Sequence, residues 1–353
     1  MATNEVWGTG TATAEGLVVG DVPLIARAFE LGDVRDVEFL AAGIMNRNWR
    51  IGSAAGTYAL KLLCDVPAEL ARRNASVLDG LAAAGLPVCA PVRTVQGEAL
   101  LSIGSRDYLV SPWAQGVHRE GIKLSLTEVE SFGAVVAELH NALSVQAGVV
   151  LPAAENRPRA MVTGPETALA KADRLLRRLA DLDEPAEFDA IARGLLEDRK
   201  VLIDKYRSSV PVAGEALGLF GWVHGDLQYR NIMWSGGSVS AVLDWDRVAV
   251  KALGEEVCRT AQVQFGGEHG YLDLDRVAAF VTGYRSLRSL PRADLADAVD
   301  RLWWKRMSDY WIFEFHYDRA DHGPDALLEP SERLLAWWTD RRQEVQEAYA
   351  AGA

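Results

Sequence analysis

The sequence contains little cysteine, no long apolar run and no excess of positive charge. Its three cysteines are scattered and lack paired spacing, which argues against a disulfide framework and against a zinc site. No apolar run approaches the roughly 18–20 residues that span a bilayer, and the first residues lack the basic and apolar regions of a secretory signal. We therefore expect a reduced, soluble, cytoplasmic protein with no membrane partner.

Acidic residues outnumber basic ones, with 49 Asp and Glu against 37 Lys and Arg, so the formal net charge is −12. No basic patch is available to release counterions from a phosphate backbone, which argues against nucleic acid as a partner. Solubility alone explains an acidic balance, and long-range attraction of a cationic small substrate is a second explanation. The composition leaves the oligomeric state open.

Hydrophobic periodicity divides the 353 residues into two parts. A helix over 21–31 precedes a part with strand-like alternation, where we expect strands at 37–41, 48–51, 58–63, 92–95, 99–103 and 108–110 and a helix at 67–84. The second part has helical spacing, with short apolar runs at 222–224, 232–234 and 239–243. Its long helices are expected at 127–143, 166–180, 186–207, 255–265, 273–287, 293–317 and 331–350.

This layout predicts an α+β chain with two lobes, in keeping with a prior of roughly 150 residues per domain. The expected parts are a loose N-terminal lead-in, a small β-rich lobe, a short hinge and a larger helical lobe. Their boundaries are 1–20, 21–110, 111–116 and 117–353.

The residues that carry chemistry are concentrated between positions 222 and 246. Asp226 follows one short apolar run, Asn231 comes five residues later before a second run, and Asp244 follows a third. Phosphoryl transfer needs a carboxylate that orients the attacking hydroxyl and accepts its proton, and oxygen ligands that hold Mg²⁺ against the nucleotide phosphates. An Asp, an Asn and an Asp at this spacing can supply that set.

The pattern His224-Gly-Asp226-(x4)-Asn231 with Asp244-Trp-Asp246 resembles the catalytic segment of the aminoglycoside phosphotransferase/choline kinase/homoserine kinase superfamily. These are small-molecule kinases with a bilobal, protein-kinase-like fold. A His-Gly-Asp tripeptide alone carries little information, and the specificity lies in the full spacing. The resemblance implies that Asp226 is the catalytic base, that Asn231 and Asp244 bind Mg²⁺, that His224 supports the loop and that ATP is the donor.

The resemblance extends over about residues 36–290 and gives Lys61 a role. Alternation along its strand turns Lys61 to the face opposite its apolar neighbours, and the resemblance implies that it clamps the ATP phosphates. The helix that follows usually carries a Glu that pairs with this lysine, but the matching position here is Asn74. An amide can hydrogen-bond an ammonium without neutralising it, and Glu69 could substitute only if the helix is shifted, so the partner of Lys61 is left open.

Two further segments resemble the nucleotide site of the superfamily. Residues 42–50, with Asn46 and Asn48, are similar to the nucleotide-covering loop of choline and homoserine kinases. Residues 108–116 are similar to the hinge, whose backbone would meet the adenine edge near Ser111 and Trp113.

Other polar residues are interpreted as structural. Glu256 falls where the superfamily often has an acidic residue that braces the catalytic loop, and His140 is interpreted as a packed residue at a helix end. A basic run in the 166–180 helix is interpreted as a solvated face; its members are Lys171, Arg174, Arg177 and Arg178.

Tryptophan is abundant, with 11 in the chain and five in the last 51 residues. Aromatic stripes in the helix at 293–317 surround Glu314. A helix that is apolar nearly all round is normally buried, so packing in the core is the first interpretation of these aromatic residues. An aromatic wall with a carboxylate also attracts an ammonium group. We hypothesise that Glu314 or Asp318, with Asp246, meets an amino group of the acceptor.

The sequence thus predicts a kinase that uses ATP and Mg²⁺ to phosphorylate a small, amine-bearing molecule. The first candidate acceptor is an aminoglycoside-like antibiotic or amino sugar, which would suit a role in antibiotic resistance. The alternative acceptor is an amino alcohol such as homoserine or choline. A protein kinase is disfavoured because only eleven residues separate Asp244 from Glu256. A third interpretation is a non-catalytic protein that binds nucleotide and regulates a partner. Only Asn74, in place of the usual glutamate, favours it, whereas the complete set of proposed base, metal ligands and lysine argues against it. The acceptor and the choice of ATP or GTP are left open.

Overall fold

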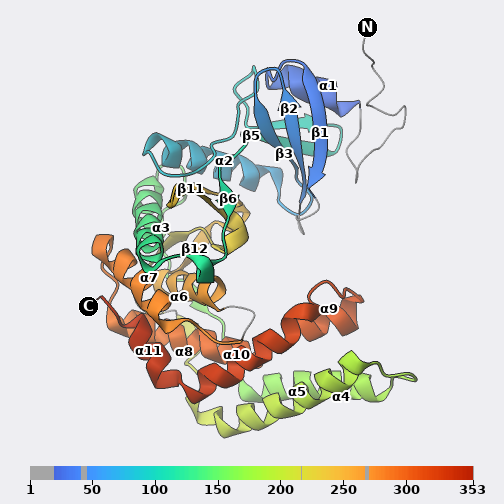
Figure 1. The fold of residues 1–353 in the computed structure, drawn as a ribbon, viewed down its shortest axis with the longest axis vertical. Helices are drawn as coiled ribbons and strands as arrows, with labels where there is room; N and C mark the ends of the chain where they lie inside the picture. The colour runs from blue at the N-terminus through green and yellow to red at the C-terminus, as the bar shows by residue number, and fades with distance from the viewer. Residues whose placement is uncertain (1–19, 41–45, 216, 267–269, 353) are drawn as a thin grey trace. The chain divides into compact units, whose positions relative to one another are not determined.

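The protein is described here by a computed structural model of residues 20–40, 46–215, 217–266 and 270–352 (Figure 1). The chain forms two compact units, each described by itself. The first comprises Met1–His118, Ala142–Ala153 and Arg230–Val248, and the second comprises Arg119–Asn141, Ala154–Tyr229 and Ala249–Ala353. The first carries the main sheet and the second is mostly helical, so the predicted α+β class is confirmed. The expected lead-in up to residue 19 lies outside the described residues.

An antiparallel five-stranded sheet forms the centre of the first unit, in the order β1-β2-β3-β5-β4 (Figure 1). Its strands are β1 (Val34–Leu40), β2 (Arg47–Ser53), β3 (Thr57–Leu62), β4 (Leu100–Ile103) and β5 (Arg106–Pro112). One face buries Trp49, Ile51 and Leu60 against helix α1 (Asp21–Ala28). Because strand residues alternate, Lys61 projects to the other face, as its sequence position predicts.

The first unit also contains helix α2 (Ala68–Ala83) and a second, smaller sheet. The short turn at Trp245–Arg247, which follows that sheet in the chain, packs against α2. A three-stranded sheet has the order β11-β10-β6, from β6 (Val117–His118), β10 (Ile232–Ser235) and β11 (Ser238–Val242). The turn between β10 and β11 uses Gly236 and Gly237, both with positive φ, as a two-residue hairpin turn requires. This hairpin separates Asn231, just before β10, from Asp244, just after β11.

The second unit is mostly helical and carries two short strand pairs, β9 (Phe220–Val223) with β12 (Ala249–Ala252) and β7 (Arg159–Ala160) with β8 (Gly214–Glu215). Its helices are most of α3 (Leu126–Gln146), then α4 (Pro165–Ala180), α5 (Glu187–Lys205), α6 (Leu253–Phe265), α7 (Leu274–Leu287), α8 (Arg292–Ser308), α9 (Trp311–Arg319), α10 (Leu328–Asp340) and α11 (Arg342–Tyr349). Helices α3 and α7 cross closely at two glycines. A Cβ on Gly133 would lie 2.0 Å from the Phe280 carbonyl oxygen, and one on Gly283 would lie 1.9 Å from that of Glu130.

The helix predicted over 293–317 is wrong in one respect, because it is two helices, α8 and α9. The Ser308 hydroxyl donates to the Trp304 carbonyl, Asp309 adopts an extended backbone, and the Asp309 carboxylate accepts from the Trp311 N–H at 3.1 Å. The buried Arg199 guanidinium donates to the Asp309 carbonyl, which satisfies an acceptor that the helix end leaves open.

Two other predicted elements differ from the structure. Residues 92–95 form no strand, although the Val92 N–H donates to the Val110 carbonyl at 2.8 Å. The helix predicted over 331–350 begins earlier, at Leu328, and is interrupted at Arg341, where the backbone leaves helical geometry between α10 and α11. Pro330 is tolerated because it lies in the first turn of α10, where its missing N–H costs no helical bond.

Within the described residues, none of the helices combines the length and the apolar character needed to cross a membrane.

Candidate functional site

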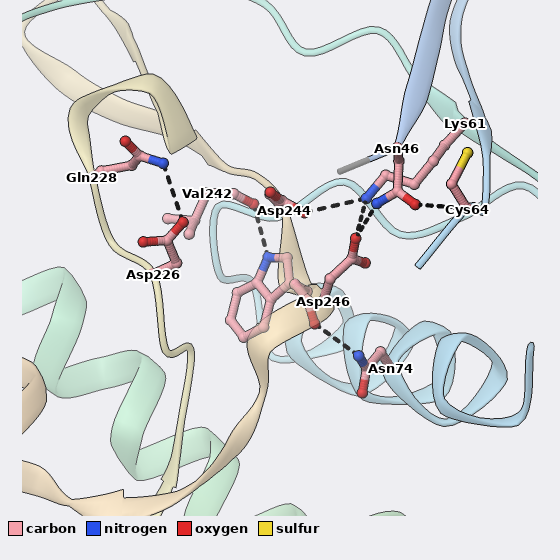
Figure 2. Close-up of polar contacts among 10 residues, drawn as sticks. Asn46, Lys61, Cys64, Asn74, Asp226, Gln228, Val242, Asp244 and Asp246 are labelled. Atoms are coloured by element: carbon pink, nitrogen blue, oxygen red, sulfur yellow. Dashed lines mark hydrogen bonds and ion pairs between the residues drawn. The ribbon is translucent and has the colours of Figure 1, made fainter. Parts of the chain in front are cut away.

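Lys61 in β3 lies among three polar side chains of the first unit (Figure 2). Its ammonium Nζ is 2.9 Å from Oδ2 of Asp246 and 3.2 Å from Oδ1 of Asp244. The Nδ2 group of the buried Asn46 donates to the same Asp246 oxygen at 2.7 Å, and its Oδ1 accepts from the Cys64 N–H at 3.1 Å. A lysine on the sheet and two carboxylates from a segment about 180 residues later thus form one polar cluster, which we call the Lys61 cluster.

The charge of Lys61 is stabilised by this cluster. Burial by itself lowers the pKa of the ammonium, but the neighbouring Asp246 and Asp244 carboxylates outweigh that effect, and the pKa is raised above its ordinary value. Lys61 therefore carries a positive charge throughout the neutral range, which is the state that binds nucleotide phosphates.

Asp244 has a strained backbone and a partly exposed carboxylate. Its φ of 60° lies in the left-handed region, which is costly for residues other than glycine and is tolerated best by Asn and Asp. Its side chain is 45% exposed although it is paired with Lys61. Strain of this kind persists where the surrounding structure enforces it, and it is enriched at functional sites.

Asn231 is buried at the end of a short 3₁₀ turn, and its backbone carbonyl accepts from the Leu243 N–H at 2.8 Å. This bond closes the base of the β10–β11 hairpin and holds the backbone of Asn231 beside that of the residue before Asp244. The two predicted metal ligands are therefore carried by one rigid hairpin.

Asn74 does not pair with Lys61, which answers a question that the sequence left open. The Asn74 side chain is buried, and its Nδ2 donates to the Trp245 carbonyl at 2.8 Å (Figure 2). Its Oδ1 accepts from the Arg73 guanidinium. The Trp245 indole N–H in turn donates to the Val242 carbonyl. Asn74 thus holds the backbone between Asp244 and Asp246, and these two carboxylates replace the missing helix glutamate.

Asp226 lies in the second unit, in the loop after β9. Its Oδ1 accepts from the Arg259 guanidinium at 2.9 Å. Its Oδ2 accepts from the Gln228 amide at 3.1 Å (Figure 2). The Asp226 N–H donates to Nδ1 of His224 at 3.2 Å. The carboxylate is thus held from both sides, and the supporting role of His224 is confirmed.

Glu256 in α6 braces the same loop, as predicted. Its carboxylate is buried and accepts from the backbone N–H groups of His224 and Gly225. The buried His140, whose other ring nitrogen lies 2.8 Å from the Tyr284 hydroxyl, is 2.8 Å from the same carboxylate. Burial raises the pKa of Glu256, but these contacts outweigh that effect and lower it below its ordinary value.

Replacing Glu256 by Gln is expected to destabilise the second unit by about 3 kcal/mol, because hydrogen bonds to a buried charged acceptor are lost. Since the pKa of Glu256 is lowered in the folded state, its contribution is present above the unfolded value of about 4.5 and is lost as the pH falls through the folded value. Denaturant unfolding at pH 7 and pH 4 should show the difference from wild type shrinking at the lower pH. The exposed neighbour in Glu255→Gln is the matched control, and an equal effect of both substitutions would contradict the bracing role.

The residues predicted to meet the nucleotide lie in or beside three strands of the main sheet. Lys61 is in β3, Asn48 is in β2 and Ser111 is in β5, whereas Asn46 just precedes β2 and Trp113 just follows β5. Asn48 pairs with Lys61 across β2 and β3, and Ser111 pairs with Ala59 across β5 and β3. The Trp113 N–H donates to the Thr57 carbonyl at 3.0 Å, so this donor is not available to an adenine edge. Residues 42–45 of the predicted covering loop lie outside the described residues.

Glu314 and Asp318 in α9 face basic side chains of α4. Glu314 lies 3.4 Å from the Lys171 ammonium, and Asp318 accepts from Arg174 at 2.9 Å. The α4 basic run is therefore not merely a solvated face, since three of its four members pair with α9: Lys171, Arg174 and Arg178. Core packing is confirmed for Trp303 and Trp304, which are fully buried, whereas Trp311 is 41% exposed.

Sequence reasoning missed Arg259 and Gln228 as partners of Asp226. Arg259 is three residues after Glu256 on α6, so the two share a helix face. That spacing could have indicated that both side chains reach the same loop. Gln228 is two residues after Asp226 and gave no separate signal.

Comparison with known proteins agrees with this description. The model of the phosphotransferase enzyme family (APH) matches residues 36–290. The chain is similar to the homoserine kinase of Methylobacillus glycogenes, with 22% identity over 335 residues, 89% of this chain and 95% of that protein. It is also similar to the homoserine kinase of Methylorubrum populi, with 26% identity over 323 residues, 87% of this chain and 88% of that protein.

Two solved structures share the fold at low sequence identity. One is a spectinomycin phosphotransferase in complex with ADP and spectinomycin, with a TM-score of 0.62, 14% identity, and 95% of this chain and 98% of that chain covered. The other is a microcompartment-associated aminopropanol kinase, with a TM-score of 0.58, 16% identity, and 94% and 100% covered. These likenesses confirm the protein-kinase-like fold. Since the family model matches well over half of the chain, the protein belongs to the phosphotransferase enzyme family and is a small-molecule kinase.

Proposed function

We propose that this kinase transfers the γ-phosphate of ATP to the hydroxyl of a small amino alcohol of the homoserine type. The observation that carries the proposal is the Lys61 cluster, in which a lysine with a raised pKa lies against two carboxylates, one of them on a strained backbone. A fixed positive charge beside carboxylates suits the binding of a nucleotide triphosphate with its metal ion.

On the nucleotide side, Lys61 contacts the phosphates, Asn46 and Asn48 border them, and the backbone around Ser111 meets the base. The side chains of Asn231 and Asp244 fit Mg²⁺, because it is a hard cation that prefers carboxylate and amide oxygens and uses few protein ligands. The exposed fraction of the Asp244 carboxylate supports this assignment. When bound, Mg²⁺ neutralises charge on the phosphates. In this scheme Asp246 holds the Lys61 ammonium in place and does not contact the amino group of the acceptor.

On the acceptor side, Asp226 orients the attacking hydroxyl and accepts its proton. Arg259 and Gln228 fix its carboxylate, and the Glu256 brace fixes the loop that carries it. Holding a base in one orientation removes much of the entropic cost of the reaction. We leave Glu314 and Asp318 out of the acceptor site, because basic side chains of α4 already pair with both.

An acceptor of the homoserine type is supported by two observations. The relatives named homoserine kinase align over 95% and 88% of their own lengths. The Arg259 side chain at Asp226 is 38% exposed although it is paired, so its charge still reaches the surroundings, and homoserine, unlike choline or aminopropanol, carries a carboxylate that such a charge attracts. An aminoglycoside-like antibiotic is the second candidate, favoured by the fold shared with a spectinomycin phosphotransferase.

Coupled measurement of ADP release with homoserine, choline, aminopropanol and spectinomycin tests the acceptor. Homoserine is expected to have the highest kcat/KM, by about tenfold or more, which is the worth of one charge-assisted contact. Replacing Arg259 by Gln should reduce that preference. Preference for spectinomycin would overturn the homoserine proposal, and absence of turnover with a broad panel of hydroxylated amines would overturn the function.

A further inference from the structure

Two histidines and an aspartate converge at the C-terminal end of α9. His316 lies in the last turn of that helix, and His322 and Asp325 follow it in the chain. Nδ1 of His316 is 2.8 Å from Oδ2 of Asp325, and Nδ1 of His322 is 3.4 Å from the same oxygen. The two Nδ1 atoms are 3.1 Å apart. Among the described residues, these three form the group whose geometry suits a metal ion.

Hydrogen bonds alone do not explain this triangle. A ring nitrogen carries either a proton or a lone pair, never both. If both Nδ1 atoms carry protons, two donors face each other; if only one does, the other nitrogen turns its lone pair to the carboxylate oxygen. With an ionised carboxylate, each arrangement of protons on the two rings therefore leaves one of the three contacts repulsive.

A cation among the three atoms removes the conflict, because each atom then directs a lone pair at it. Zn²⁺ binds imidazole nitrogen and carboxylate oxygen at about 2.0–2.1 Å in tetrahedral geometry, which places ligand atoms roughly 3.3 Å apart. The observed separations of 2.8, 3.1 and 3.4 Å lie close to that value.

The surroundings hold the ligands in place and leave room for another. The His316 ring stacks on Phe188 with 4.1 Å between centroids and 13° between planes. The Asp325 N–H donates to the His322 carbonyl at 3.2 Å, which closes the loop between the ligands. Oδ1 of Asp325 is buried and has no hydrogen-bond partner in the part of the chain that the structure describes. Asp325 and Phe188 also line a cavity of about 220 Å³.

We propose that His316, His322 and Asp325 bind one Zn²⁺ ion, with a water molecule as the fourth ligand. The scattered cysteines argue against a zinc site with thiolate ligands. They do not argue against a site built from histidine and aspartate. Its nitrogen donors distinguish it from the oxygen-only set of Asn231 and Asp244, since imidazole selects zinc over magnesium. The ion would join the last turn of α9 to the 3₁₀ turn at Asp325–Leu327.

Cobalt binding to the full-length, tag-free, metal-stripped protein tests this site. Titration with Co²⁺ is expected to give one equivalent bound with the visible absorption of a tetrahedral complex, and Zn²⁺ should displace it. His322→Gln and Asp325→Asn should each weaken Co²⁺ and Zn²⁺ binding at least tenfold, whereas the control His118→Gln should bind as wild type. His322 is 63% exposed, so its replacement should leave folding intact, as circular dichroism would confirm.

Thermal unfolding gives a readout that is independent of cobalt. Excess Zn²⁺ should raise the Tm of wild type and of His118→Gln but not that of His322→Gln, because a ligand stabilises only the state that binds it. The proposal is overturned if wild type binds no stoichiometric Co²⁺ or Zn²⁺, or if His322→Gln and Asp325→Asn retain wild-type affinity. The kinase assay plays no part in this test, so the metal site and the proposed acceptor stand or fall separately.

Discussion

Asp226→Asn is expected to lower kcat about 10³-fold while leaving ATP affinity within twofold of wild type. A positioned general base contributes roughly 10²- to 10⁴-fold to a reaction. Asn has nearly the same shape and can still accept from Arg259, so the loop should keep its structure, but it cannot take the proton of the attacking hydroxyl. The measurement is the rate of phosphorylated product at saturating ATP and acceptor, with nucleotide binding followed separately by calorimetry.

An Asp→Asn change at an exposed position provides the control. Asp275→Asn, in the first turn of α7, removes the same charge from a residue with no assigned role and should keep wild-type turnover. Turnover of Asp226→Asn within tenfold of wild type would refute the base assignment. A matching loss of ATP affinity would instead place Asp226 among the nucleotide-binding groups.

Lys61→Met is expected to raise the KM for ATP by roughly 10- to 100-fold, because charge-assisted contacts to phosphate are worth about 1.5–3 kcal/mol. Met has a similar length and no charge, so the change isolates the ammonium. The pKa of Lys61 is raised from an ordinary value of 10.5, and a raised pKa keeps the cation present at every pH below that value. The wild-type KM for ATP should therefore show no step from Lys61 between pH 6 and 9.

Two variants separate the role of this lysine from a general effect of lost charge. Lys251→Met removes a lysine from strand β12 and should change the KM for ATP less than twofold. Lys61→Arg keeps the charge but presents a planar group, so an intermediate KM is expected. Thermal unfolding shows whether the unpaired carboxylates of Asp244 and Asp246 destabilise Lys61→Met. A KM for ATP within twofold of wild type in folded Lys61→Met would contradict the phosphate contact.

The sequence by itself determined the features that depend on local pattern. Alternation in β3 predicted the face of Lys61, and the strand-flanked spacing of Asp226, Asn231 and Asp244 predicted the family and the chemistry. Glu256 and His140 were predicted as structural from their positions relative to that motif. Strand alternation, helix periodicity and motif spacing each involve residues near in sequence, so one chain read alone is enough to reveal them.

Only the tertiary structure decided which distant side chains pair. It identified Asp244 and Asp246 as the partners of Lys61, which the sequence had left open, joined Arg259 to Asp226, and turned the basic run of α4 toward α9. It also divided the helix expected over 293–317, because Arg199 from α5 supplies the donors that its broken end needs. Ion pairs and helix ends depend on groups brought together by packing across the chain, and the strength of a charge pair is set by burial that no local pattern records.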